Sequence, residues 1–173
     1  MINCSNIPDI IELKNFDGNF GNYENAVFER YNKVKDLSNV RINNLPLKHK
    51  KYPTENNRDC TFLHITTSSD SGGNKKLKEW ERNSELRRLE RIEWPFFILK
   101  ECFDSCDKIF TWENKRKGKI RFLIWCPEIE YLIILDSRKS FYLLWTAYPV
   151  TESHRKKKLR KEYDEYIKSK NAL

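Results

Sequence analysis

The sequence lacks the short motifs that mark several enzyme classes. Its 173 residues contain no glycine-rich phosphate loop, no HExxH, no GxSxG and no paired CxxC motif. The carboxylates are dispersed, so a two-metal nuclease centre would have only the Glu128 to Glu130 stretch and Asp136 to draw on. A metal-free chemistry fits this inventory better, and we expect no cofactor and no metal.

The five cysteines are odd in number and scattered, which argues against a secreted disulfide framework. Cys102 and Cys106 stand at helical i, i+4 spacing, where two thiols can share a metal ion. No histidine or second cysteine pair completes a four-ligand set nearby. Reduced core thiols are the alternative, and we favour it over a zinc site.

The sequence also has no long apolar run. No window approaches 18 uncharged apolar residues, and the first residues lack a charged segment followed by an apolar stretch. We therefore expect a cytoplasmic protein with no membrane partner.

Apolar residues are scarce and cations abundant. The hydrophobic fraction is 39% and the charged fraction 34%, against roughly 45–50% and 25% in average domains. Ten Phe, eight Tyr and five Trp compensate for the lean core. The net charge is +8 and the pI is about 9.2, which makes polyanions the natural class of partner.

The length fits one domain preceded by an arm. Residues 1–22 are polar and Asn-rich and form the expected N-terminal arm, whereas residues 23–173 form a single domain. Apolar positions recur at Val27, Tyr31 and Val34 and predict a helix over 23–37.

Four further segments precede the first regular sheet pattern. The sequence predicts a connecting loop over 43–60, a strand over 60–67, a helix over 74–93 that Asn83 and Ser84 break and cap, and a new segment from Pro95.

The second half of the chain has the pattern of a sheet. Apolar runs at 109–113, 119–126, 130–136 and 140–148 are separated by turns short enough for hairpins. We predict an α+β fold in which N-terminal helices pack on a four-stranded antiparallel β-sheet meander. Leu159, Tyr163 and Ile167 predict a basic C-terminal helix from Thr151 onward.

Candidate functional residues fall in three places, each with a plain structural alternative. His64 ends the predicted strand and can move a proton at neutral pH, or it is a hydrogen-bonded structural residue. Strand alternation puts Thr146 and Tyr148 on one face together with Tyr142 and Leu144, where they contact a phosphate or are ordinary rim hydroxyls. The third place is a cluster of three arginines.

This cluster, Arg87, Arg88 and Arg91, lies in the predicted second helix. Helical spacing permits a two-arginine anion clamp, but interleaved glutamates permit a salt-bridged solvated face instead. The tail from His154 to Lys170 carries eight cations and three acids, which suits RNA or DNA but also plain solubility. Tyr131, Trp112, Trp125 and Trp145 offer stacking surfaces only where they are exposed.

The ordered set of segments resembles the BECR-type nucleases, the Barnase, EndoU, colicin and RelE-like ribonucleases, in their phage and mobile-element branch. The likeness spans about residues 58–165. It rests on "TFLHITT", "RRLERIEWPFFIL", "TW", "YLIILD" and "FYLLWTAYPV", followed by "RKKKLRKEY". The insertion "SSDSGGNKK" and the first 57 residues depart from that pattern.

The resemblance implies an endoribonuclease, a hydrolase of the toxin or phage-conflict type. It would cut tRNA, rRNA or mRNA without a metal ion, leaving a 2′,3′-cyclic phosphate, and a protein antitoxin or inhibitor would restrain it. The implied catalytic residues are His64 as general acid or base, Arg88 and Arg91 on the phosphate, and Thr146 with Tyr148 beside it. The residues expected to bind nucleic acid are Lys119, Arg121, Arg155, Lys156, Lys157, Lys158 and Arg160.

Two other functions stay open at this point. A non-catalytic RNA- or DNA-binding module of the same fold would use the tail cations more than His64. A protein-interaction subunit would use exposed aromatic residues and the N-terminal arm.

Overall fold

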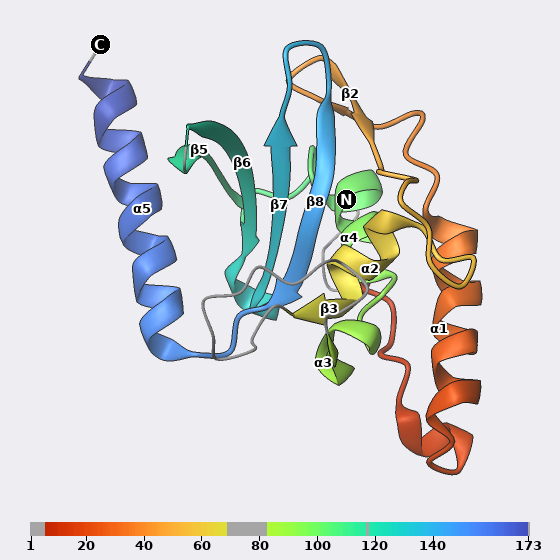
Figure 1. Cartoon of the computed structure of the whole chain (residues 1–173). Helices are drawn as coiled ribbons and strands as arrows, with labels where there is room; N and C mark the ends of the chain where they lie inside the picture. Colours follow the sequence, from red (N-terminus) through yellow and green to blue (C-terminus); the bar gives the residue numbers. More distant parts are fainter. Residues whose placement is uncertain (1–5, 69–82, 117, 173) are drawn as a thin grey trace.

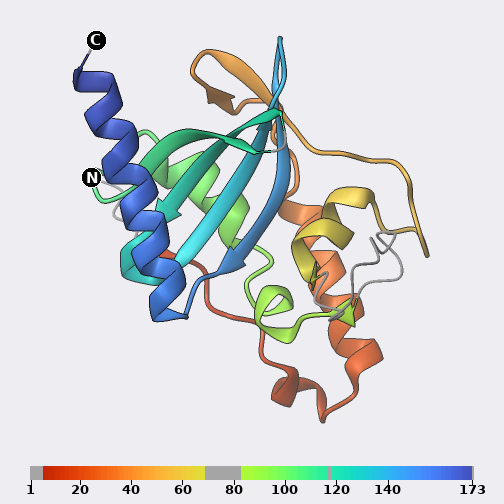
Figure 2. The same cartoon turned by 60° about the vertical axis from the view of Figure 1, so that its left-hand side comes forward.

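The computed structural model describes residues 6–68, 83–116 and 118–172 (Figure 1). One curled, six-stranded sheet forms its centre, in the order β1-β2-β8-β7-β6-β5 (Figure 2). The strands are β1 (Arg41–Ile42), β2 (Leu45–Lys48), β5 (Phe110–Arg116), β6 (Lys119–Cys126), β7 (Tyr131–Ser137) and β8 (Tyr142–Pro149).

The predicted four-stranded antiparallel meander is wrong, because the sheet is mixed and larger. Strands β5 to β8 pair antiparallel, but β8 continues outward to β2 through a parallel pairing of Leu47 with Tyr142. This pairing uses backbone groups that would otherwise stand open along the edge of β8. In the sequence, the Asn43–Asn44 pair is the signal for the β1–β2 hairpin. These two residues form its turn with φ values of 48° and 65°, at the start of the predicted loop.

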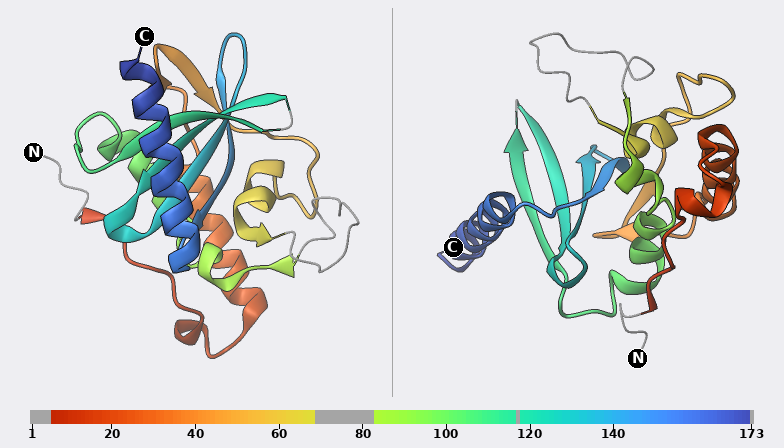
Figure 3. Two further views of the ribbon diagram at one scale, coloured as in Figure 1. Left: turned by 90° about the vertical axis from the view of Figure 1, so that its left-hand side faces the viewer. Right: turned by 90° about the horizontal axis from the view of Figure 1, so that it is seen from below.

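Helices from the first part of the chain cover one face of the sheet (Figure 3). They are α1 (Phe20–Val34), α2 (Cys60–Thr66) and α4 (Trp94–Phe97), which runs into the π-helical turn η4 (Ile98–Cys102). Their apolar side chains form one core with the facing residues of β6, β7 and β8.

The C-terminal helix α5 (Ser153–Asn171) covers part of the opposite face, as Figure 3 shows, and confirms the predicted closing helix. Leu159 is buried there, and the Tyr163 ring stacks on Phe110 with the centroids 4.7 Å apart. A second core gathers around them from the outer-facing residues of β5, β6 and β7. None of the described helices has the length and apolar character needed to cross a membrane.

The segment predicted as a strand at 60–67 is helix α2. Asp59 accepts a hydrogen bond from the Phe62 amide at 3.0 Å and caps the helix. The Thr66 hydroxyl donates back to the Phe62 carbonyl at 2.8 Å. These local bonds override the strand preference of the β-branched and aromatic residues.

The predicted helix over 74–93 is helical in its described part only at 86–89. Residues 74–82 lie outside the described residues. Asn83–Ser84 form strand β4, which pairs with β3 (Thr67–Ser68), and the short helix α3 spans Leu86–Leu89. The β3–β4 ribbon thus ties the end of α2 to the start of α3.

The N-terminal arm runs along the helical face. It contains the 3₁₀ helix η2 (Leu13–Phe16), and its Ile11 amide donates to the Glu90 carbonyl at 2.9 Å. The indole of Trp94 donates to the Pro8 carbonyl at 2.8 Å. Backbone hydrogen bonds therefore fix this segment beside the α3–α4 turn.

Asp59 holds α2 on α1, and we expect its replacement by alanine to destabilise the fold. The buried carboxylate accepts from the Tyr31 hydroxyl at 2.6 Å as well as from the Phe62 amide, and burial together with this carboxylate raises the pKa of Tyr31. Loss of two charge-assisted bonds predicts a decrease of about 2–3 kcal/mol in the free energy of unfolding, measured by urea denaturation. Asp36→Ala, which removes an exposed turn bond to Ser38, should have a much smaller effect. Equal effects would contradict this role of Asp59.

Candidate functional site

A β-bulge in β8 changes which side chains at the end of this strand point to the face that α5 covers. The pairing with β7 shifts between Ile134 and Leu135, so Trp145 is the extra residue. Thr146 and Tyr148 consequently lie opposite Ile134 and Leu132, which belong to the core under α5. The two hydroxyl side chains share a face as predicted.

The strand alternation nevertheless fails at this bulge. Tyr142 and Leu144 point into the core under the helices, away from Thr146 and Tyr148. A prediction in which side chains alternate between the two faces at every residue cannot detect an extra residue inserted into one strand of a pair.

Arg88 joins three elements at the end of β8. Its Nη1 donates to the Thr67 carbonyl at 3.0 Å and to the Thr146 hydroxyl at 3.4 Å, and its Nε donates to Glu85. The guanidinium carbon lies 4.8 Å from the centre of the Tyr148 ring, in cation–π contact. The guanidinium is therefore fixed beside both hydroxyl side chains.

His64 lies next to this cluster on α2. Its side chain is 5% exposed, and the centre of its ring is 4.7 Å from that of Trp145. The Thr146 hydroxyl donates to the His64 carbonyl at 3.1 Å. This carbonyl lies in the last turn of α2, where the helix itself offers no partner.

Arg91 does not join the cluster. Its Nη1 donates to the Arg87 carbonyl at 3.0 Å and to Glu90 at 2.9 Å, and its guanidinium lies 5.0 Å from the Trp94 ring centre. Because α3 spans only Leu86–Leu89, helical spacing does not continue to Arg91. The structure thus brings together Arg88, Thr146, Tyr148 and the backbone carbonyl of His64, but not Arg91.

An open pocket of about 700 Å³ lies between this cluster and the start of α5. Arg88, Tyr148 and Arg155 line it, and Arg155 donates to the Tyr148 hydroxyl at 3.1 Å. Glu85 and Glu152 are the carboxylates of the lining. The pocket can receive an anion of the size of a phosphodiester between Arg88 and Arg155.

A second pocket of about 400 Å³ continues from Arg155 along α5 and over the sheet. Its cations are Lys115, Arg116, Arg121, Arg155 and Lys158, and among the described residues that line it the carboxylate is Glu162. We call this second pocket the α5 groove. Sequence reasoning missed Lys115 and Arg116 because it expected the strand to end at 113, although β5 extends to Arg116.

The predicted nucleic-acid-binding residues divide into three groups. Arg121, Arg155 and Lys158 line the α5 groove. Lys156 forms an ion pair with Glu130, and Arg160 pairs with Asp164. Lys119 and Lys157 are exposed but line neither pocket.

The aromatic residues and thiols are mostly buried. Tyr131, Trp112 and Trp125 are in the cores, so only the half-buried Trp145 remains as a stacking surface of the four considered. Burial raises the pKa of the Tyr131 hydroxyl and raises that of the Cys126 thiol to about 12. Within the described ranges, no group of three or more His, Cys, Asp or Glu side chains could hold a metal ion.

Searches of protein-family models, curated proteins and solved structures returned no match. The resemblance to BECR-type nucleases thus stays a hypothesis from the sequence.

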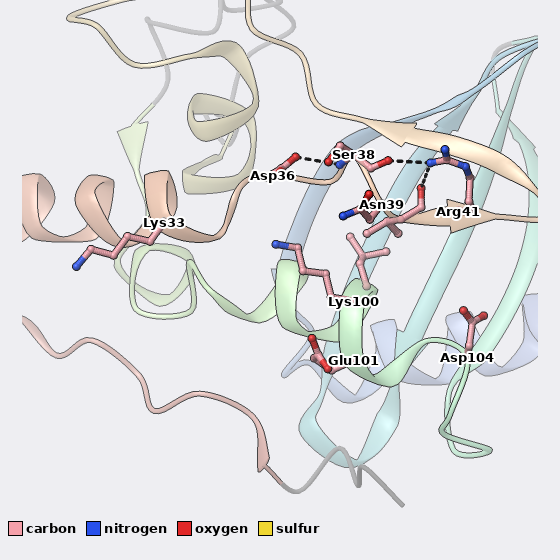
Figure 4. Close-up of a pocket in the computed structure, with 10 residues that line it drawn as sticks. Lys33, Asp36, Ser38, Asn39, Arg41, Lys100, Glu101 and Asp104 are labelled. Carbon is pink, nitrogen blue, oxygen red and sulfur yellow. Dashed lines mark hydrogen bonds between the residues drawn. The ribbon is translucent and has the colours of Figure 1, made fainter.

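A separate pocket of about 530 Å³ lies among the end of α1, β1 and η4 (Figure 4). It shares no described residue with the two pockets above. Lys100 donates to the Val34 carbonyl at 2.7 Å, and Arg41 donates to the Ser38 carbonyl at 2.9 Å, as Figure 4 shows for Arg41. These cations hold the backbone, and we assign this pocket no ligand.

Replacing Thr146 with valine keeps the shape of the side chain and removes its hydroxyl. The His64 carbonyl and Arg88 would each lose a partner, so we expect the free energy of unfolding to fall by about 1–2 kcal/mol in urea denaturation. Thr151→Val is the matched control, because the exposed Thr151 accepts one bond from Arg87. A larger decrease in the control would show that Thr146 does not fix this junction.

Proposed function

We propose that the protein is a metal-independent endoribonuclease whose reaction takes place in the pocket at Arg88 and Tyr148. The observation that carries this proposal is the contact of the Arg88 guanidinium with Thr146 and Tyr148, beside a pocket that Arg88, Tyr148 and Arg155 line. Fixed cations and hydroxyl donors of this kind stabilise charge that develops on a reacting phosphate.

In the proposed reaction, the ribose 2′-oxygen attacks the adjacent phosphorus. A bond forms between O2′ and phosphorus, and the bond from phosphorus to O5′ breaks. His64 accepts the 2′-hydroxyl proton, and a proton from solvent completes the 5′-hydroxyl of the leaving strand. The products are a 2′,3′-cyclic phosphate and a free 5′-hydroxyl end.

Each remaining residue has a role that follows from its position. Arg88 and Arg155, which both line the pocket, would donate to the non-bridging phosphate oxygens. The Thr146 hydroxyl can turn from the His64 carbonyl to a phosphate oxygen, and it holds α2 against β8 before substrate binds. Tyr148 positions both arginines through its ring and its hydroxyl.

Cleavage of tRNA, ribosomal RNA and mRNA in the presence of EDTA tests this activity. We expect His64→Ala, Arg88→Ala and Thr146→Val to lower the rate about 10²-fold or more each. Arg91→Ala is the matched control, since Arg91 lies in the same segment but contacts Glu90 and Trp94, and it should cleave at nearly the rate of the unaltered protein. No cleavage of any RNA, together with no toxicity on expression, would reject the proposal.

A non-catalytic RNA-binding module is the second candidate, and the burial of His64 favours it. An imidazole that is 5% exposed and packed on Trp145 is poorly placed to reach a substrate. The pocket cations would still bind phosphates without turnover.

This second candidate predicts salt-sensitive RNA binding that His64→Ala leaves unchanged. Arg155→Gln with Lys158→Gln should weaken binding about tenfold, because two cations no longer neutralise phosphates. Fluorescence anisotropy at several salt concentrations measures both effects. Detectable cleavage that disappears in His64→Ala would exclude a purely binding role.

The proposed cellular setting follows from the sequence resemblance. A cytoplasmic ribonuclease of this kind would be restrained by a protein antitoxin or inhibitor. Its net charge of +8 suits an acidic partner.

A further inference from the structure

The α5 groove adjoins the pocket at Arg88. Arg155 lines both, because it stands on the first turn of α5, where the chain leaves β8. From there the groove passes Arg121 and Lys158 and ends at Lys115 and Arg116 near the β5–β6 hairpin. The cations of the α5 groove therefore begin at a residue that also lines the pocket at Arg88.

The charges along this path are not balanced by the described residues that line it. Five cations face one carboxylate, Glu162, which accepts a hydrogen bond from Asn114 at 3.2 Å. The Nε atom of Arg121 is buried and has no hydrogen-bond partner among the described residues. Its guanidinium instead lies over the Trp145 ring, 5.3 Å from the centre.

Asp136 is the acid that faces Arg121 across the sheet. The two residues are opposite each other in the β6–β7 pairing. The Asp136 carboxylate is in an ion pair with Arg138 at 2.6 Å, but its Oδ2, like Arg121 Nε, makes no hydrogen bond among the described residues. Asp136 thus balances part of the Arg121 charge without accepting a hydrogen bond from its Nε, and Arg121 is left as a donor for an anion that enters the groove.

The shape of the groove favours one strand over two. Arg155 and Lys158 project from its helical wall, whereas Arg121 lies on its floor beside Leu123 and Ile134. At about 400 Å³ it lies at the small end of the range of about 300–1,000 Å³ for ligand pockets. A double helix presents its phosphates on a convex outer surface and cannot contact wall and floor together.

We propose that the α5 groove binds the phosphodiester of a single-stranded RNA segment adjoining the one at Arg88 and Thr146, with Arg121 and Lys158 as phosphate ligands. Leu123 and Ile134 provide an apolar floor for the sugar or base. This inference rests on the proposed function for the location of the first phosphate.

Binding of 2′-O-methyl RNA, which has no attacking hydroxyl, tests the groove separately from cleavage. The unaltered protein and Arg121→Gln/Lys158→Gln are compared by displacement of a labelled octanucleotide with an unlabelled octanucleotide, dinucleotide or duplex. We expect the double variant to bind the single-stranded octanucleotide about tenfold more weakly, with little change for the dinucleotide. The slope of log affinity against log salt should fall by about 1.4, since each single-strand phosphate that is no longer neutralised accounts for about 0.7.

The matched control is Lys33→Gln/Lys51→Gln, which makes the same charge change on exposed lysines of other pockets. It should leave octanucleotide binding close to that of the unaltered protein. Lys115→Gln/Arg116→Gln, at the far end of the groove, gives the same test if Arg121→Gln unfolds the protein. Equal weakening in groove and control variants, equal weakening for dinucleotide and octanucleotide, or tighter binding of duplex would overturn the inference.

Failure of the two proposals can be told apart. Cleavage of RNA by a protein whose groove variants bind normally would reject the groove and keep the nuclease. Groove-dependent binding of the single strand without any cleavage in EDTA would reject the nuclease and keep the groove.

Discussion

Strands β6 and β7 carry apolar side chains on both faces, and the rest of the structure depends on covering them. The first part of the chain provides the helices over one face, and the last part provides α5 over the other. Among the described residues of α5, Leu159 alone is buried, and the helix contacts β5 through Tyr163 and Glu162. The α5 groove lies between this helix and residues of β5, β6 and β7, and the pocket at Arg88 is lined by the end of β8 and the start of α5.

Polar groups at the junction satisfy one another without ligand. The end of α2 has a carbonyl that Thr146 pairs, and Arg88 ties the same hydroxyl to β3 and α3. The bulge at Trp145 sets the register of this strand end, so that Thr146 lies opposite Ile134. A site whose groups are held by the fold needs little rearrangement to bind an anion.

The sequence predicts elements whose signal is local and repeated. The strand at 119–126 and the C-terminal helix are predictable because apolar spacing alone defines them. Strand β2 is not predicted because it pairs with β8 through only two residue pairs. Helix α2 is not predicted because the cap by Asp59 stabilises a helix in a segment whose residues favour a strand. The prediction of Arg91 as a phosphate ligand depends on a helix that continues to residue 91, whereas α3 ends at Leu89.

Binding and cleavage make different demands on the same surface. Affinity needs only cations that neutralise phosphates, and the cations of the α5 groove lie on β5, β6 and α5. Turnover also needs an imidazole that reaches the 2′-hydroxyl, and His64 is on α2, with its ring packed on Trp145. The Arg121 guanidinium also lies over the Trp145 ring, so under the proposed function a phosphate that drew Arg121 away would alter the packing around His64. Trp145 would then connect occupation of the groove with the access of substrate to His64.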